Sequence, residues 1–96
     1  MIGAMRKSVY TAEYTALRVE LRASRKTAGL SQRQLAERLK VPHSWVAKVE
    51  SGERRIDLVE CGWFFAACGV DPFPAMKRVM QKFPASSIRR AFKGGR

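Results

Sequence analysis

One short segment, residues 43–48, carries polar side chains at a spacing that places them together on one helix face. With Val46 and Val49 pointing into a core, the outward positions are His43, Ser44, Ala47 and Lys48. A lysine donates to guanine N7 and O6, a serine to several base edges, and an alanine contacts a thymine methyl group. His43 donates or accepts according to its tautomer. These side chains suit contacts to DNA bases; the alternative is a solvated helix face.

The elements that must position this segment are two short helices joined by a tight break. The first begins at Ser31, where Ser31 and Gln34 form a capping box. Pro42 disfavours helical geometry at Val41, and it can itself open the next helix, which ends at Gly52. The pattern predicts a helix-turn-helix over residues 31–52, whose second helix is shaped to enter the major groove.

A helix on the N-terminal side of this unit is expected from near Thr11 to Gly29. Its arginines at 18 and 22, and Lys26, are predicted to point away from the core. Its inner face is formed by Tyr10, Tyr14, Leu17, Leu21 and Ala28.

Two further helices are expected after the unit. Asp57 and Glu60 form a second cap, and the helix they open, closed by Gly69, is apolar nearly all round. We therefore expect it to be the buried centre of the domain. Asp71 and Pro72 start a last helix that runs to about residue 83. Its apolar stripe consists of Phe73, Met76, Met80 and Phe83.

Phosphate contacts are expected around the second helix of the unit. Gln32 stands at the start of the preceding helix, where its side chain and exposed backbone N–H groups suit one phosphate. Arg54 and Arg55 follow Gly52, and can neutralise a neighbouring phosphate or remain a solvated pair. Trp45 is expected to cover the junction of the two helices, with contact to a sugar or thymine methyl group as the alternative.

The charge of the chain is strongly positive and unevenly distributed. The formal net charge is +11, and residues 72–96 contain seven basic and no acidic residues. A chain this basic associates with polyanions, of which nucleic acid is the commonest in the cytoplasm. The basic end of the chain can follow phosphates beside a binding site or simply aid solubility.

Other features bound the class of protein. The chain of 96 residues suits one small domain, and we expect an arm at 1–10, the DNA-binding domain at 11–83 and a basic tail at 84–96. Cys61 and Cys68 lie seven residues apart on one helix, beyond disulfide reach, so we expect two small core residues. No metal, cofactor or catalytic set is predicted, and the chain is not expected to be an enzyme. No membrane-spanning run or signal peptide is found, so a cytoplasmic location is expected.

A longer motif makes a resemblance specific. The chain reads GLSQ at 29–32, followed by the pattern LAxxL, and then V, SxV, KxE and GxRR up to residue 55. Together with Leu21, Arg25 and the Gly69–Val70 pair, this series resembles the phage-repressor family (Cro/cI, XRE-type) over roughly residues 17–72.

The resemblance implies an all-α fold: a compact five-helix, lambda-repressor-like DNA-binding domain, here with a basic C-terminal extension. It implies a two-fold dimer on double-stranded DNA, with Gln32 on a phosphate. It also implies that Arg25 and Glu50 form an ion pair between two helices; if the pair is buried, loss of one partner would cost about 3–5 kcal/mol. The alternative is two solvated charges. Lys40 and Pro42 depart from the family pattern, which often has glycine at the first position and a capping serine or threonine at the second.

The function that follows is a sequence-specific transcriptional regulator, most simply a repressor. Two alternatives stay open: an antitoxin that binds a toxin and represses its own operon, and a non-specific architectural or RNA-binding protein. A homodimer is expected, because one recognition helix covers only a few base pairs. Either core packing or a dimer contact accounts for the apolar residues of the last two helices: Trp63, Phe73, Met76, Met80 and Phe83.

Overall fold

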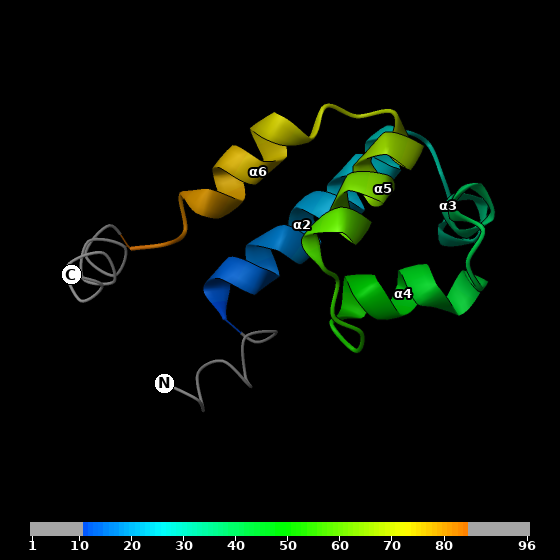
Figure 1. The fold of residues 1–96 in the computed structure, drawn as a ribbon, viewed down its shortest axis with the longest axis horizontal. Helices are drawn as coiled ribbons and strands as arrows, with labels where there is room; N and C mark the ends of the chain where they lie inside the picture. Colours follow the sequence, from blue (N-terminus) through cyan, green and yellow to red (C-terminus); the bar gives the residue numbers. More distant parts are fainter. Residues whose placement is uncertain (1–10, 85–96) are drawn as a thin grey trace.

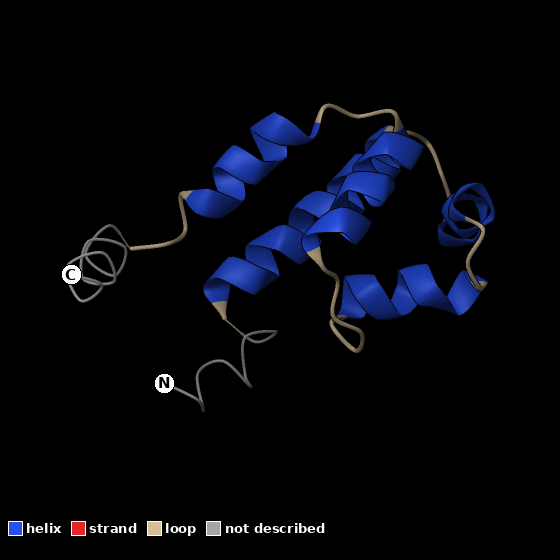
Figure 2. Cartoon of the chain, viewed as in Figure 1, coloured by secondary structure: helices blue, strands red, loops and turns tan. Residues whose placement is uncertain are grey.

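The computed structural model describes residues 11–84, and five helices make up most of this part of the chain. They are α2 (Ala12–Thr27), α3 (Gln32–Leu39), α4 (His43–Ser51), α5 (Leu58–Cys68) and α6 (Pro72–Met80). Figure 2 shows helices and loops and no strand among the described residues. The all-α, five-helix fold is therefore confirmed. The predicted arm, the residues of the predicted tail after Pro84 and Tyr10 lie outside the described residues.

The arrangement of the helices places α4 at one side of the molecule. In Figure 1, α2 and α5 run through the middle of the molecule. The helix α3 lies at one end of this pair and α4 lies below it, while α6 lies on the opposite side from α4. The core between them consists of Leu21, Leu35, Ala36, Val46, Val49, Ile56, Cys61, Phe64, Phe65, Cys68 and Ala75. Both cysteines are free and buried, as expected.

Local signals in the sequence set where the helices begin. Both predicted capping boxes are present: the Ser31 hydroxyl accepts from the backbone N–H of Gln34, and Asp57 accepts from that of Glu60. At the far ends of α4 and α5, Gly52 and Gly69 adopt the left-handed conformation. The last helix ends at Met80, three residues before the predicted end.

The expectation that α5 is buried on all sides is wrong. One of its faces packs on the core through Phe64 and Phe65, but Leu58, Val59 and Trp63 are 76%, 61% and 61% exposed. The domain is too small to cover both sides of a central helix, because the other helices pack against one side of it only. In the described residues, none of the helices has the length and apolar character that a membrane span requires.

Candidate nucleic-acid interface

The recognition helix, α4, buries one side and exposes the other. Val46 and Val49 are fully buried, which fixes the rotation of the helix on the core. The predicted base-reading residues therefore lie outside: His43, Ser44 and Lys48 are exposed, and Ala47 is half-buried. The exposed polar groups stand at the start and middle of the helix, on the side that a DNA groove would meet.

The C-terminal end of α4 is held through Glu50. Arg25 of α2 donates to both carboxylate oxygens of Glu50, at 2.6 and 3.0 Å, and to the carbonyl of Leu30 at 2.8 Å. The two side chains are only 8% and 4% exposed. The hydrogen bond from Arg25 to Glu50 raises the pKa of the arginine above its usual value. The structure thus brings the predicted pair together in the interior, between α2 and α4.

Gln32 joins the same cluster from α3. Its side-chain amide donates to Glu50 Oε1 at 3.0 Å, and the residue is half-buried. As the first residue of α3, Gln32 also has a backbone N–H without a partner within the helix. The side chain is therefore committed to the protein, and the backbone of this helix end is the part that suits an anion.

Arg54 lies between the recognition helix and α5. Its guanidinium stacks 5.0 Å from the ring centre of Trp45 and donates to the two carboxylate oxygens of Glu60 at 3.2 and 3.1 Å. The hydrogen bonds from Arg54 lower the pKa of Glu60, and the hydrogen bond from the backbone N–H of Asp57 makes a smaller contribution. The arginine side chain is 39% exposed. A carboxylate already offsets most of its charge, so it is less suited to a phosphate than an arginine without such a partner.

Arg55 is exposed and lies at the same loop. Its guanidinium lies 6.0 Å from the ring centre of Tyr14, and the Tyr14 hydroxyl accepts a 2.9 Å hydrogen bond from the backbone N–H of Ile56. The loop after α4 is therefore bound to α2 by its backbone, and the charge of Arg55 remains at the surface.

Trp45 is partly buried and packs against the core, which is the favoured of its two expected placements. Together with Leu39 and Val41 it lines a small pocket that reaches Trp63 and Glu60 on α5. It covers the junction of α3 and α4 from the α5 side.

Arg18 does not point away from the core, contrary to expectation. It donates from Nη1 to the backbone carbonyl of Glu50 at 3.1 Å, and from Nη2 to the Thr15 hydroxyl at 3.5 Å. Helical periodicity places residue 18 beside the inner face, and a long arginine side chain can cross from there to the end of α4. The sequence carries no signal for this contact, because it joins residues 32 positions apart.

Among the described residues, large apolar side chains remain exposed on α2, where Val19 is 58% exposed, and in two groups on later helices. On α5 they are Leu58, Val59 and Trp63, which we call the α5 patch. On and after α6 they are Phe73, Met80 and Phe83, exposed to 76%, 53% and 40%, which we call the α6 patch. Met76, between them in the predicted stripe, is partly buried and packs against the core.

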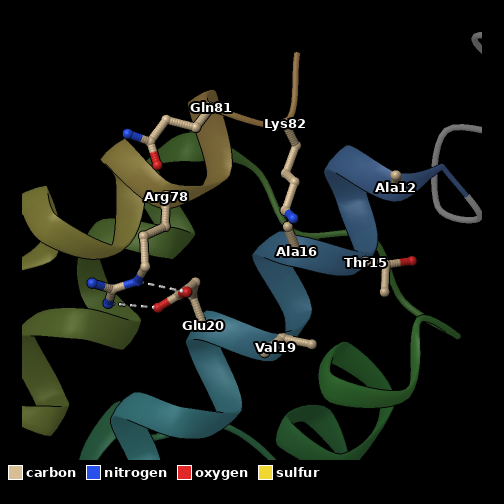
Figure 3. Close-up of a pocket in the computed structure, with 8 residues that line it drawn as sticks. All are labelled: Ala12, Thr15, Ala16, Val19, Glu20, Arg78, Gln81 and Lys82. Carbon is tan, nitrogen blue, oxygen red and sulfur yellow. Dashed lines mark hydrogen bonds and ion pairs between the residues drawn. The ribbon is translucent and has the colours of Figure 1, made fainter. Parts of the chain in front are cut away.

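A groove between α2 and α6 borders this second region. Figure 3 shows Ala12, Ala16 and Val19 along one side, with Gln81 and Lys82 on the other. An ion pair crosses it, in which Arg78 donates to both oxygens of Glu20 at 2.8 Å. The pair lowers the pKa of Glu20 and joins α6 to α2.

Comparison with known proteins agrees with this geometry. A family model described as a helix-turn-helix domain matches residues 16–74. A solved structure, an XRE-family like protein from Pseudomonas syringae pv. tomato str. DC3000, is similar with a TM-score of 0.72 and 36% sequence identity, over 84% of this chain and 99% of that one. No curated protein matches the chain. The family match spans more than half of the sequence and contains α3, α4, the loop after α4 and α5. The chain therefore belongs to the XRE-type family of helix-turn-helix, DNA-binding transcriptional regulators.

Proposed function

We propose that this protein is a sequence-specific repressor that binds a two-fold symmetric operator through the major groove. The observation that supports it best is the division of α4 into two sides. Val46, Val49 and Glu50 hold the helix from within, while His43, Ser44 and Lys48 remain exposed. A fixed helix with free hydrogen-bonding groups on its outer side is what direct readout of bases requires.

Lys48 is proposed to read a guanine, because its ammonium group reaches N7 and O6 in the major groove. Ser44 and His43 are proposed to contact bases from the first turn of α4, and Ala47 to pack on a thymine methyl group. The side chain of Ala47 is a methyl group, so its contribution is a close approach and not a hydrogen bond.

Phosphates on either side of the groove are proposed to bind the start of α3 and the loop after α4. Gln32 contributes its backbone N–H, aided by the positive end of the helix. Arg54 and Arg55 contribute positive charge from the loop after α4, and Arg54 also binds Glu60. These phosphate contacts set the register and the affinity of binding, but they do not discriminate between base sequences.

The homodimer is proposed to form through the α5 patch. Glu60 is the only charged residue within α5, and it is paired with Arg54, so two copies of this face meet without repulsion. The α6 patch is flanked by Lys77 and Lys82, and two copies would bring like charges together. Of the residues considered for the interface from the sequence, Trp63 is therefore favoured over those of α6.

The proposal is tested by selecting bound duplexes from a random pool and measuring affinity for the selected sequence. Lys48→Ala should lose about 1–3 kcal/mol of discrimination at one base position. Without the lysine, the binding free energy no longer differs between guanine and another base at that position. Lys77→Ala removes the same charge on α6 and serves as the control, with discrimination unchanged.

Two results would count against the proposal. Equal affinity for random and selected duplexes would favour non-specific binding to nucleic acid. A selected sequence without two-fold symmetry would keep the recognition helix but remove the symmetric dimer.

A second candidate function, an antitoxin or other protein-binding role, is supported by the α6 patch. Phe73 is 76% exposed on α6, the helix that lies on the opposite side from α4 in Figure 1, so a protein partner can occupy this helix while DNA is bound. This function predicts that Met80→Asp abolishes binding to the toxin encoded beside the gene and leaves operator binding unchanged. Equal toxin binding by the wild-type protein and by Met80→Asp would exclude this function.

A further inference from the structure

The C-terminal carbonyl groups of α4 obtain hydrogen bonds from the chain nearby, which includes the Ser51 hydroxyl at 3.1 Å from the Lys48 carbonyl, and from α2. The carbonyls of Lys48 and Val49 accept from backbone N–H groups of the following loop, those of Arg54 at 3.1 Å and Gly52 at 3.2 Å. The carbonyl of Glu50 accepts from Arg18 on α2, at 3.1 Å. A cationic side chain at this position also interacts favourably with the negative end of the helix.

We infer that Arg18 is a positioning residue that sets the pose of the recognition helix and so contributes to operator specificity. The inference rests on the proposed function for its DNA readout. Arg18 and Arg25 lie seven residues apart on α2, about 10 Å along its axis, and both bind Glu50. One holds the backbone of that residue and the other holds its carboxylate. Two contacts at different points restrict rotation as well as translation, which one contact alone does not.

Gly52 is part of the same arrangement. It adopts a φ of +86°, and a Cβ atom there would lie 3.2 Å from Arg18 Nε and 3.4 Å from Cδ and Cζ. The guanidinium therefore lies directly against the backbone at the end of α4. Glycine suits this position because of its positive φ, and a Cβ atom would displace the Arg18 side chain by a few tenths of an ångström.

The arrangement is not one that stability alone would favour. Among the described residues, Nε of Arg18 is buried without a hydrogen-bond acceptor, and an unsatisfied buried donor is unfavourable. Replacement of Arg18 by methionine removes the hydrogen bond to Glu50 and this unsatisfied donor together. We expect these two effects to offset each other in the free energy of unfolding, so the pose of α4 can be changed with little loss of stability.

A small change of pose is enough to affect base contacts. His43 lies seven residues from Glu50, about 10 Å along α4, so a tilt of about 5° at the held end moves His43 by about 0.9 Å. Hydrogen bonds to base edges lose most of their strength over such a distance. The first turn of α4 has no side-chain cap of its own, because Pro42 occupies the N-cap position.

The test compares Arg18→Met with Arg22→Met. Arg22 lies one turn further along α2 and is exposed, so the control loses the same charge without losing a contact to α4. Affinity is measured by fluorescence anisotropy for the selected operator and for a scrambled duplex of equal length. Arg18→Met should lower the ratio of the two affinities at least about tenfold, while Arg22→Met leaves the ratio unchanged. Arg18→Lys retains a donor for the Glu50 carbonyl and should restore most of the ratio.

Amide hydrogen exchange gives a readout that needs no DNA. Exchange at residues 47–54 should be faster in Arg18→Met than in Arg22→Met, with melting temperatures that agree within a few degrees. Equal ratios and equal exchange in the two variants would overturn the inference. A large loss of stability in Arg18→Met would also overturn it, since Arg18 would then have a general structural role. If the wild-type protein selects no duplex, the proposed function fails, while the exchange comparison still decides the role of Arg18.

Discussion

Glu50 is the residue on which the recognition helix depends most. Its carboxylate binds Arg25 and Gln32, and its backbone carbonyl binds Arg18, so three side chains from α2 and α3 converge on one residue of α4. Such a cluster gives orientation more than net stability, because the cost of removing the charges from water opposes their attraction.

The ion pair of Arg54 and Glu60 predicts a pH dependence. Arg54 holds the pKa of Glu60 below its usual value, so the pair stabilises the fold above the unfolded-state pKa of about 4.3, and this contribution is lost as pH falls through the lower folded-state pKa. Glu60→Gln keeps the capping acceptor for the Asp57 N–H but removes the charge. We expect it to cost up to about 1 kcal/mol at pH 7, because the pair is partly exposed, and nothing at the acid end. Urea unfolding across this pH range measures the difference.

Arg54→Met supplies the control for this prediction. It should reduce the pH dependence in the same way, and the double variant should add little to either single change. A Glu60→Gln protein with the same stability difference at all pH values would show that another group causes the dependence.

Single residues differ in how far the sequence predicts them. The buried positions of α4 follow from periodicity, because a helix with one covered side must place apolar residues three and four apart. The partners of Arg18 and Arg54 do not follow, because they depend on where α2 and α5 lie in space. The sequence therefore places the outward face of α4 but not the contacts that hold it.

Among the elements, the turn between α3 and α4 departs most from ideal geometry. Lys40 ends α3 with φ 58° and ψ 43°, and it is the one non-glycine residue of the described chain with positive φ. Lys40 stands where the family pattern often has glycine, and its left-handed conformation is strained for a residue with a side chain.

Lys40→Gly should relieve this strain. We expect the free energy of unfolding to rise by about 0.5–1 kcal/mol, since glycine adopts this conformation without steric cost but gains freedom in the unfolded chain. Thermal unfolding should show a rise in melting temperature of a few degrees. Lys40→Ala removes the same side chain but keeps the strain, and should show no gain. Equal stability of the two variants would mean that the backbone at residue 40 is not strained.

At the scale of the molecule, the part that the structure describes presents the α5 patch and the α6 patch, and only the α5 patch is proposed to join two copies. Leu58 and Phe73 are both 76% exposed and both lie in the first turn of a helix, where an aspartate is tolerated. They therefore form a matched pair of sites for testing the interface.

Leu58→Asp should weaken binding to an operator with two half-sites at least about tenfold and leave binding to a single half-site unchanged, because only the contact between copies is lost. Phe73→Asp should leave binding to both duplexes unchanged. Fluorescence anisotropy on the two duplexes, with light scattering of the complexes, measures both. The reverse result, with the loss in Phe73→Asp, would place the dimer contact on α6.

By itself, the sequence determined the helices, their caps, the helix-turn-helix and the face of α4 that lies outside. These features depend on spacing and on neighbours a few residues away, so they can be derived from the chain in order. Only the tertiary structure decided that Arg18 joins Arg25 in binding Glu50, that Arg54 binds Glu60, and that one side of α5 is exposed. The Arg18 contact joins residues 32 positions apart, and the other two features depend on how α5 packs against the rest of the domain. In a domain of this size, whether an apolar side chain becomes core or surface is settled by which helices are available to cover it.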